Sequence, residues 1–216
     1  MKSKKNITFK AEELNYLRLL AKQYPTVQAA SKEIINLQAI LNLPKGTEHF
    51  LSDLHAEHEA FLHIMNSCSG EVKEKLNECF NTVMSRHDRD ELATLIYYPE
   101  EKLALIADEI EDMDEWYRIT IHRLVVLCRW VATKYTRSKV RKSLPEDHAA
   151  IIDELIHLRT EEPDKRDYYE IIIETIIETG QADAMITAFA TAIKRLTMDH
   201  LHIVGDISTV DLALTW

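Results

Sequence analysis

Two short stretches of the sequence carry residues that could bind a metal ion. Asp53 and His55 follow the apolar run 49–52, and Asp206 follows the apolar run 201–204. Each run is bounded by glycine or aspartate and predicts a short β-strand. In α/β sheets, ligand-binding groups lie beyond the carboxyl ends of the strands. If these two strands are adjacent and parallel, the three side chains meet at one edge of the sheet.

The residue types indicate which chemistry such a site would support. A carboxylate with an imidazole suits Mn, Fe or Zn better than Ca or Mg. On an extended chain, Asp53 and His55 would point to the same side, because side-chain direction repeats every two residues. Asp206 could then bridge two ions, as in phosphate hydrolysis. The structural alternative is that Asp-x-His occurs by chance and that the aspartate only caps the next helix.

Most of the remaining sequence predicts α-helix. The chain has four glycines, far fewer than the roughly 7% that turn-rich proteins use. Apolar residues recur at helical spacing over 11–23, in a second segment capped by Thr26, and through most of 71–199. Gly180 is placed to end a helix. We therefore expect an α+β fold that is mainly helical.

This pattern divides the chain into four segments. They are N-terminal helices (1–45), a first strand with its metal-binding crest (46–70), a helical insertion (71–199), and a second strand with a divergent tail (200–216). Trp116, Tyr117 and Trp130 are expected to pack within the insertion. Cys128 lies in an apolar stretch and is expected in the core rather than as a nucleophile.

Composition excludes several classes of protein. The formal net charge of −10 argues against a general nucleic-acid binder, whose affinity rests on neutralising phosphates. Three cysteines without a Cys-x-x-Cys pair suit buried thiols in a reducing cytoplasm. No apolar run approaches the roughly 18 residues of a membrane span, and no signal core follows the first residues. We expect a cytoplasmic protein that contacts neither nucleic acid nor membrane; the sequence defines no oligomeric state.

A basic segment and several histidines offer secondary candidates. Within 129–142, Arg137, Lys139 and Arg141 could receive a sugar phosphate, since these side chains suit phosphate oxygens. The alternative is a solvated helix face. His58 and His63 follow the first crest without an H-E-x-x-H pattern, and we interpret them as surface or core histidines. His200 and His202 share one face of the second strand, where packing is favoured over metal binding.

Four stretches resemble class III fructose-1,6-bisphosphatase: residues 44–57 (PKGTEHFLSDLHAE), 93–103 (ATLIYYPEEKL), 134–142 (KYTRSKVRK) and 200–207 (HLHIVGDI). The resemblance runs from about Leu14 to Ile207 and implies the N-terminal portion of a calcineurin-like metallophosphoesterase. That family has a β-sandwich flanked by helices and a two-metal site, usually manganese. By resemblance the chain carries part of this sheet with a large helical insertion. Asp53 and His55 would hold one metal, and Asp206 would bridge both.

The resemblance also implies a reaction, the hydrolysis of the 1-phosphate of fructose 1,6-bisphosphate in gluconeogenesis. After Ile207 the family continues Tyr-Asp-Arg-Gly-Pro, whereas residues 208–216 read STVDLALTW. Codons for the family-like Asp-Arg-Gly-Pro-Gly-Ala-Asp, read after loss of one base, give Thr-Val-Asp-Leu-Ala-Leu-Thr. We therefore expect a truncated or frameshifted, inactive form. The alternatives are another calcineurin-like phosphoesterase, such as a protein phosphatase, or a non-catalytic helical interaction fragment.

Overall fold

The computed structural model describes residues 9–55, 57–107, 109–158 and 161–206. In these residues the elements follow one another as α1 (Ala11–Gln23), α2 (Val27–Ile40), β1 (Glu48–Leu51), α3 (His58–Ser67), α4 (Glu71–Phe80), α5 (Arg86–Tyr97), α6 (Pro99–Ile106), α7 (Met113–Ala132), α8 (Arg137–Ser143), the 3-10 helix η1 (Glu146–His148), α9 (Ala149–His157), α10 (Pro163–Glu178), α11 (Ala182–Thr197) and β2 (His200–Ile203). The fold is therefore mainly helical with one small sheet.

The chain divides into two compact units, 1–44 and 45–216. The first unit holds α1 and α2. The Thr26 hydroxyl accepts a hydrogen bond from the Ala29 amide at 3.1 Å, which confirms the predicted cap of α2. Neither helix buries a residue, although both carry apolar side chains. Local hydrogen bonding and capping, rather than a core, therefore define these helices.

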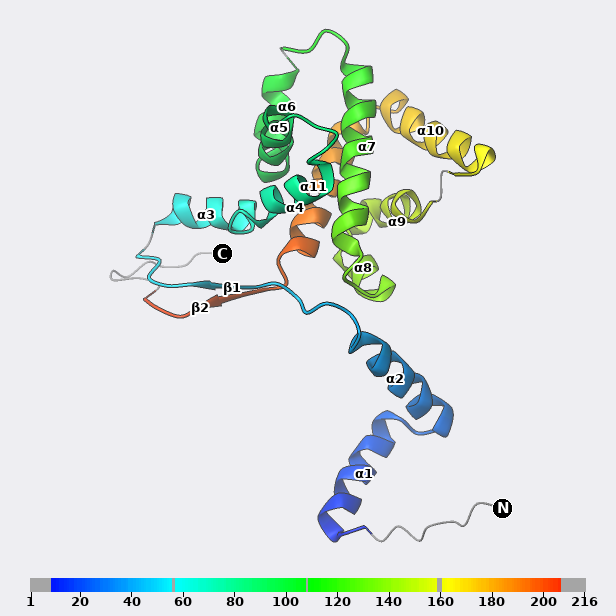
Figure 1. Ribbon diagram of the computed structural model, residues 1–216. Helices are drawn as coiled ribbons and strands as arrows, with labels where there is room; N and C mark the ends of the chain where they lie inside the picture. Colours follow the sequence, from blue (N-terminus) through cyan, green and yellow to red (C-terminus); the bar gives the residue numbers. More distant parts are fainter. Residues whose placement is uncertain (1–8, 56, 108, 159–160, 207–216) are drawn as a thin grey trace. The chain divides into compact units, whose positions relative to one another are not determined.

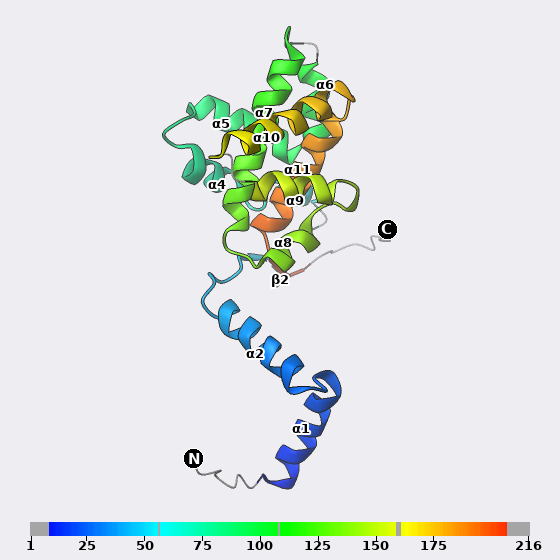
Figure 2. The ribbon, with the colours of Figure 1, turned by 90° about the vertical axis from the view of Figure 1, so that its right-hand side faces the viewer.

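The second unit contains a helical body built around α7 and α11, which contact each other more extensively than any other pair of helices. Figure 1 shows α7 as the long central helix, and Figure 2 shows α9 and α10 crossing one side of it. One continuous cluster of buried apolar residues joins these helices with α4 and α5. Its largest fully buried side chains include Phe189, Leu127 and Ile193. The predicted helical region between 71 and 199 is thereby confirmed.

Local signals set several helix ends in this body. The Asp112 side chain accepts from the Glu115 amide at the beginning of α7, and Pro163 occupies the first turn of α10, where its missing N–H costs nothing. Gly180 follows α10 with a φ of 67°, as predicted for a helix-ending glycine. The Arg129 guanidinium donates to the carbonyls of Leu155, Ile156 and Leu158 at the C-terminus of α9. Arg129 thus satisfies orphan carbonyls.

The sheet consists of β1 and β2, which pair in parallel with Glu48 opposite His200 and Leu51 opposite Ile203. Both strands were predicted from their apolar runs, and the structure moves each one residue toward the N-terminus. In Figure 1 the two strands lie side by side and extend from the helical body toward α3. The whole helical body is therefore the connection between two neighbouring parallel strands.

Two expectations for the helical body need correction. Trp130 is 46% exposed, whereas Trp116 and Tyr117 pack against the core as expected. The indole of Trp130, near the C-terminal end of α7, lies outside the apolar face that α7 turns toward the core. The basic segment 129–142 is not one helix face, because α7 ends at Ala132 and α8 begins at Arg137. Among the described residues, no helix combines the length and apolarity required to cross a membrane.

A pair of leucine substitutions tests where the core lies. Leu127 on α7 is fully buried, whereas Leu105 on α6 is 61% exposed. Leu127→Ala should lower the free energy of unfolding by about 2–5 kcal/mol, because it leaves a cavity. Leu105→Ala should change it by about 0.5 kcal/mol or less. Urea unfolding followed by circular dichroism measures both. Equal effects of the two substitutions would contradict the core described above.

Candidate metal centre

The chain segments that follow β1 and β2 bring two of the predicted metal-binding residues, Asp53 and Asp206, close together. The chain after each strand stays paired: the Val204 amide donates to the Leu51 carbonyl at 2.9 Å, and the Leu54 amide donates to the Asp206 carbonyl at 2.8 Å. The Asp206 amide also donates to Asp53 Oδ1 at 3.2 Å. Asp53 and Asp206 are thus neighbours, as predicted. Their role as metal ligands stays a prediction.

The chain segment directly after β1, residues 53–55, is called the first crest here, and its backbone differs from the expected extended chain. Asp53 and His55 have φ values of 51° and 44°, in the left-handed region that non-glycine residues rarely adopt. The chain leaves β1 at Leu51 and turns toward α3, with the Glu57 amide donating to the Leu54 carbonyl. The period-two argument for Asp53 and His55 was therefore wrong, because a turn replaces the strand there. Strained residues of this kind cluster at ligand-binding sites.

Gly205 allows residues 204–206, the second crest, to lie close to the first crest at residues 53–55. A Cβ at this position would lie 2.3 Å from Asp53 Oδ1 and 2.7 Å from the Asp53 amide nitrogen. Any side chain would therefore push the Asp53 carboxylate away from the Asp206 amide. The glycine of the Gly-Asp pair is required by this close contact.

The donor set fits a transition metal in its chemistry. Asp53, His55 and Asp206 are exposed and offer two carboxylates and one imidazole. Among the residues that the structure describes, no three His, Cys, Asp or Glu side chains already converge tightly enough to hold an ion. The structure thus brings the two ligand-bearing backbone segments together, without a group of three donors close enough to hold an ion among the described residues.

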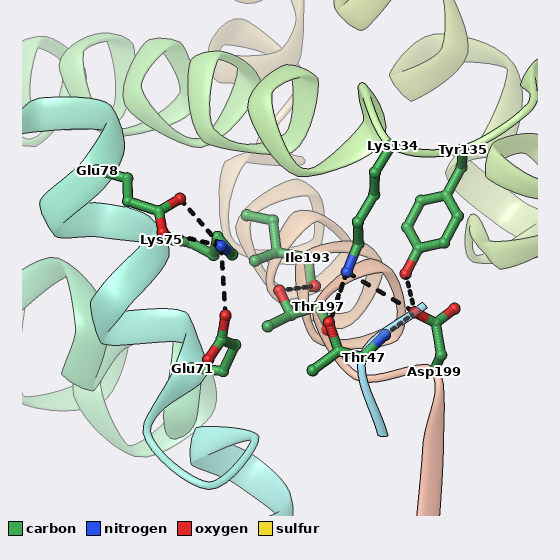
Figure 3. Close-up of polar contacts among 9 residues, drawn as sticks. All are labelled: Thr47, Glu71, Lys75, Glu78, Lys134, Tyr135, Ile193, Thr197 and Asp199. Carbon is green, nitrogen blue, oxygen red and sulfur yellow. Dashed lines mark hydrogen bonds and ion pairs between the residues drawn. The ribbon is translucent and has the colours of Figure 1, made fainter. Parts of the chain in front are cut away.

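A buried carboxylate holds the opposite end of the strand pair. The Asp199 side chain is 1% exposed and precedes β2 directly. It accepts hydrogen bonds from the Thr47 amide at 2.9 Å, from the Tyr135 hydroxyl and from the Lys139 ammonium group. Lys134 Nζ lies 3.7 Å from Asp199 and donates to Thr47 Oγ1 at 2.9 Å. Figure 3 shows Lys134 and Tyr135 converging on Asp199 and Thr47.

Electrostatics favour the charged form of this carboxylate. Burial alone would raise the pKa of Asp199, but hydrogen bonds from Lys139, Tyr135 and the Thr47 amide more than offset it and lower the pKa. The same contacts affect the donors. Burial and the bond to Asp199 raise the pKa of Tyr135, and burial lowers the pKa of Lys134 despite the nearby carboxylate. Asp199 is therefore an anion whose surroundings supply its counter-charge.

The residues predicted to bind phosphate do not join the metal crest. Lys139 pairs with Asp199 at the beginning of β2. Asp206 lies beyond the other end of that strand, roughly 20 Å away at about 3.3 Å per residue. A phosphate held at the crest is therefore out of reach of Lys139. The sequence pattern showed the positive charge of Lys139 but not the carboxylate that neutralises it.

Arg137 and Arg141 face a different partner. The Arg137 and Arg141 guanidinium groups lie 3.5 and 3.7 Å, respectively, from Oδ2 of Asp153 on α9. Together with Lys142 they line an open cavity of about 730 Å³ between α8 and α9. Their side chains are about two-thirds exposed, at 65% and 67%. This arrangement agrees with a solvated helix face, and it separates Arg137 and Arg141 from Lys139.

The remaining candidates have structural surroundings. His58 and His63 are exposed, and His63 Nδ1 lies 2.7 Å from the Tyr98 hydroxyl. His202 stacks on Phe50 across the strand pair, with ring centroids 4.7 Å apart. Cys128 is fully buried, as expected for a core thiol, and burial raises its pKa to about 12. In the described part of the chain, the contacts of these three histidines and of Cys128 are therefore not those of a nucleophile or a metal ligand.

The amino-acid sequence that builds this strand pair and helical body matches known proteins. Residues 15–209 match the family described as Firmicute fructose-1,6-bisphosphatase. A class 3 fructose-1,6-bisphosphatase of Alkaliphilus metalliredigens is 57% identical over 195 residues, covering 90% of this chain and 29% of the relative. That of Clostridium botulinum strain Hall is 53% identical over 202 residues, covering 94% and 30%. The chain therefore belongs to the Firmicute fructose-1,6-bisphosphatase family.

The sequence match covers most of this chain but only part of each relative. The chain spans about 30% of the length of the curated relatives it matches. No solved structure matches the chain significantly. The chain therefore corresponds in sequence to one part of the longer relatives.

Gly205→Ala tests the close approach of the crests. The added methyl group should displace the Asp53 carboxylate. If Asp53 is a manganese ligand, as the sequence predicts, the affinity for manganese should fall by about tenfold, since groups that orient ligands have effects of this order. The helical content should not change. Val204→Ala, at the neighbouring exposed position, should leave binding unaltered. Titration followed by manganese electron paramagnetic resonance measures the affinity. Equal affinities for the two variants would contradict the role of Gly205.

The lowered pKa of Asp199 predicts how the strand pair responds to acid. A depressed folded pKa stabilises the pairing above the unfolded value of about 3.9, and the contribution is lost as pH falls through the folded value. Hydrogen-exchange protection of the His200 amide, corrected for intrinsic rates, should hold from pH 7 to about 4 and decline below it. Amides in the middle of α7 should keep their protection over the same range.

Two controls complete the measurement. In Asp199→Asn, the His200 amide should be weakly protected at every pH. The exposed Asp167→Asn variant should behave as the unaltered chain does. A His200 profile that is identical in the unaltered chain and in Asp199→Asn would show that the carboxylate does not control the pairing.

Proposed function

We propose that the chain supplies the N-terminal part of a metal-dependent fructose-1,6-bisphosphatase, with Asp53, His55 and Asp206 as metal ligands. One observation carries the proposal. In a member of this family, Asp53 and Asp206 come from segments far apart in the sequence and meet at the carboxyl ends of two adjacent parallel strands. This is where α/β proteins place ligand-binding groups.

The proposed cofactor is manganese. Two carboxylates and an imidazole favour Mn, Fe or Zn over Ca or Mg, and the resemblance to calcineurin-like metallophosphoesterases favours manganese among these. When bound, a pair of such ions activates water and neutralises charge on the transferring phosphoryl group. The β1–β2 pair would then be part of the larger metallophosphoesterase sheet, and the helical body an insertion between its strands.

The residues of this chain would orient and hold the donors. The Asp206 amide donates to Asp53 Oδ1, which fixes one carboxylate oxygen and leaves Oδ2 for an ion. The left-handed backbone at Asp53 and His55 forms the turn between β1 and α3. A fructose bisphosphate substrate would require further donors and cationic groups, because Lys139, Arg137 and Arg141 lie away from the crest. In a cytoplasmic enzyme of this kind, these groups would come from other parts of the family's sequence.

A second function is favoured by the apolar surface of the first unit. Exposed apolar side chains on α1 and α2 include Leu19, Ile34, Ile35 and Leu37. Faces of this kind are typical of protein contacts. A non-catalytic interaction module would bind through these helices and would need no metal. Unchanged partner binding after Asp53→Ala would favour this function over the enzymatic one.

Activity measurements separate the two functions. The 216-residue chain with manganese should release no phosphate from fructose 1,6-bisphosphate above background, because three ligands do not complete a two-metal site. A chimera that joins residues 1–206 to the remaining sequence of the Alkaliphilus metalliredigens relative should be active. Asp53→Ala in the chimera should lower kcat by about a hundredfold or more, whereas Asp167→Ala should not.

An inactive chimera that folds and binds manganese would contradict this proposal. Manganese-dependent turnover by the 216-residue chain would instead contradict its expected inactivity and show that fewer ligands suffice.

A further inference from the structure

The register of β1 against β2 needs a cause other than hydrophobic patterning. Each strand has four residues, and all of them are exposed or only partly buried. Register is weakly specified in strands that bury neither face, and an isolated pair of strands is marginally stable. A slip of one residue would nevertheless move Asp206 away from Asp53. Some other contact must fix the pairing.

Asp199 makes that contact at the beginning of both strands. Its carboxylate accepts from the Thr47 amide, and its own amide donates to the Thr47 carbonyl at 3.1 Å. The His200 amide shares the same carbonyl at 3.3 Å. Both backbone groups of Thr47 are therefore held by Asp199 and its neighbour. The register that follows pairs Glu48 with His200.

The helical body holds Asp199 in turn. Tyr135 lies between α7 and α8, and Lys139 lies on α8; both donate to the carboxylate. Lys134 adds a second tie, since its ammonium group donates to Thr47 Oγ1 and to the Thr197 carbonyl at 3.4 Å. Figure 3 shows Lys134, Tyr135 and Thr197 gathered around Thr47 and Asp199, where β1 and β2 leave the body. The carboxylate thus fixes both strands to one another and to the body.

Gly46 lies directly against the Asp199 side chain. A Cβ at position 46 would lie 2.8 Å from Asp199 Oδ2. Gly46 therefore permits the approach of β1 to the carboxylate, as Gly205 permits the approach of Asp206 to Asp53. The two glycines mark the two ends of the same strand pair.

We infer that Asp199 is the positioning residue of the proposed metal centre: by fixing the register where the strands begin, it sets Asp53 opposite Asp206 where they end. This inference rests on the proposed function. Asp199 does not touch the crest, and its effect passes along four paired residues of each strand. The carboxylate acts through backbone geometry, not as a ligand.

Asp199→Asn in the 216-residue chain tests the inference. The amide cannot accept from Tyr135 and Lys139 as the charged carboxylate does, so register control should weaken. Exchange of the Leu54 and Val204 amides, which bond across the crest, should accelerate at least tenfold. Manganese affinity, measured by electron paramagnetic resonance, should fall by about tenfold to a hundredfold, the range for groups that orient ligands. Exchange in the middle of α7 and α11 should not change.

Asp153→Asn is the matched control. Asp153 is also a shielded carboxylate, 16% exposed, with Arg137 and Arg141 as partners, but it touches neither strand. Its substitution should leave Leu54 exchange and manganese affinity unchanged. Lys139→Met should reproduce part of the Asp199→Asn effect, and Lys139→Arg should restore it. A merely destabilising change would instead accelerate exchange throughout the helices.

The outcomes separate the inference from the proposed function. Unaltered Leu54 exchange in Asp199→Asn would overturn the register role. Accelerated exchange with unchanged manganese affinity would overturn the positioning role while leaving the metal centre intact. If the unaltered chain binds no manganese, the metal centre itself is contradicted, and with it the positioning role; Leu54 exchange then still decides whether Asp199 sets the register.

Discussion

A carboxylate that is shielded from water needs compensating charge, and at Asp199 that requirement ties together parts of the chain that are remote in sequence. Its side chain is 1% exposed, and its hydrogen-bond donors come from Thr47, Tyr135 and Lys139. Left without partners, such a group would cost several kcal/mol or take up a proton. The contacts that neutralise it also hold β1, β2 and the α7–α8 turn together. The geometry at the far end of the strands depends on this point.

The helical body gives that carboxylate its setting. Parallel strands cannot be joined by a tight turn, so the chain between β1 and β2 must leave the sheet and return. Here it does so as a single packed body in which α7 and α11 share the core. α7 leads to Lys134 and Tyr135, and α11 leads to Asp199. Packing of these two helices therefore brings the donors and the carboxylate together independently of the pairing between β1 and β2.

Local sequence patterns predicted the features that depend on residues close together in the sequence, such as helix caps, helices and strands. The caps at Thr26 and Gly180, the long helix α7 and both strands were predicted from spacing and turn chemistry, with each strand displaced by one residue. The crest was predicted as extended and is a left-handed turn, because the pattern does not show where a strand ends. The neighbouring positions of Asp53 and Asp206 followed from the assumption of parallel pairing.

Long-range electrostatics could not be predicted in this way. The hydrogen-bond partners of Asp199 lie 60, 64 and 152 residues away, so no local pattern indicates them. For the same reason Lys139 was interpreted as a phosphate ligand or a solvated charge, and Arg129 as part of a basic cluster. In the structure each has a fixed acceptor: Asp199 for Lys139, and the end of α9 for Arg129. A residue type indicates possible chemistry, and the fold decides which partner it has.

If Asp53 and Asp206 hold the same metal ion, manganese must bind where the two strands end. Paramagnetic broadening by substoichiometric manganese, observed in the amide spectrum of the isotopically labelled chain, locates the ion. Signals of Asp53, Leu54 and Asp206 should broaden together and first, and those of Thr47 and Lys139 should persist, because they lie roughly 20 Å away along the strands. Broadening centred on Asp153 or on the acidic helix surfaces, with the crest signals unaffected, would show that Asp53 and Asp206 do not hold the ion.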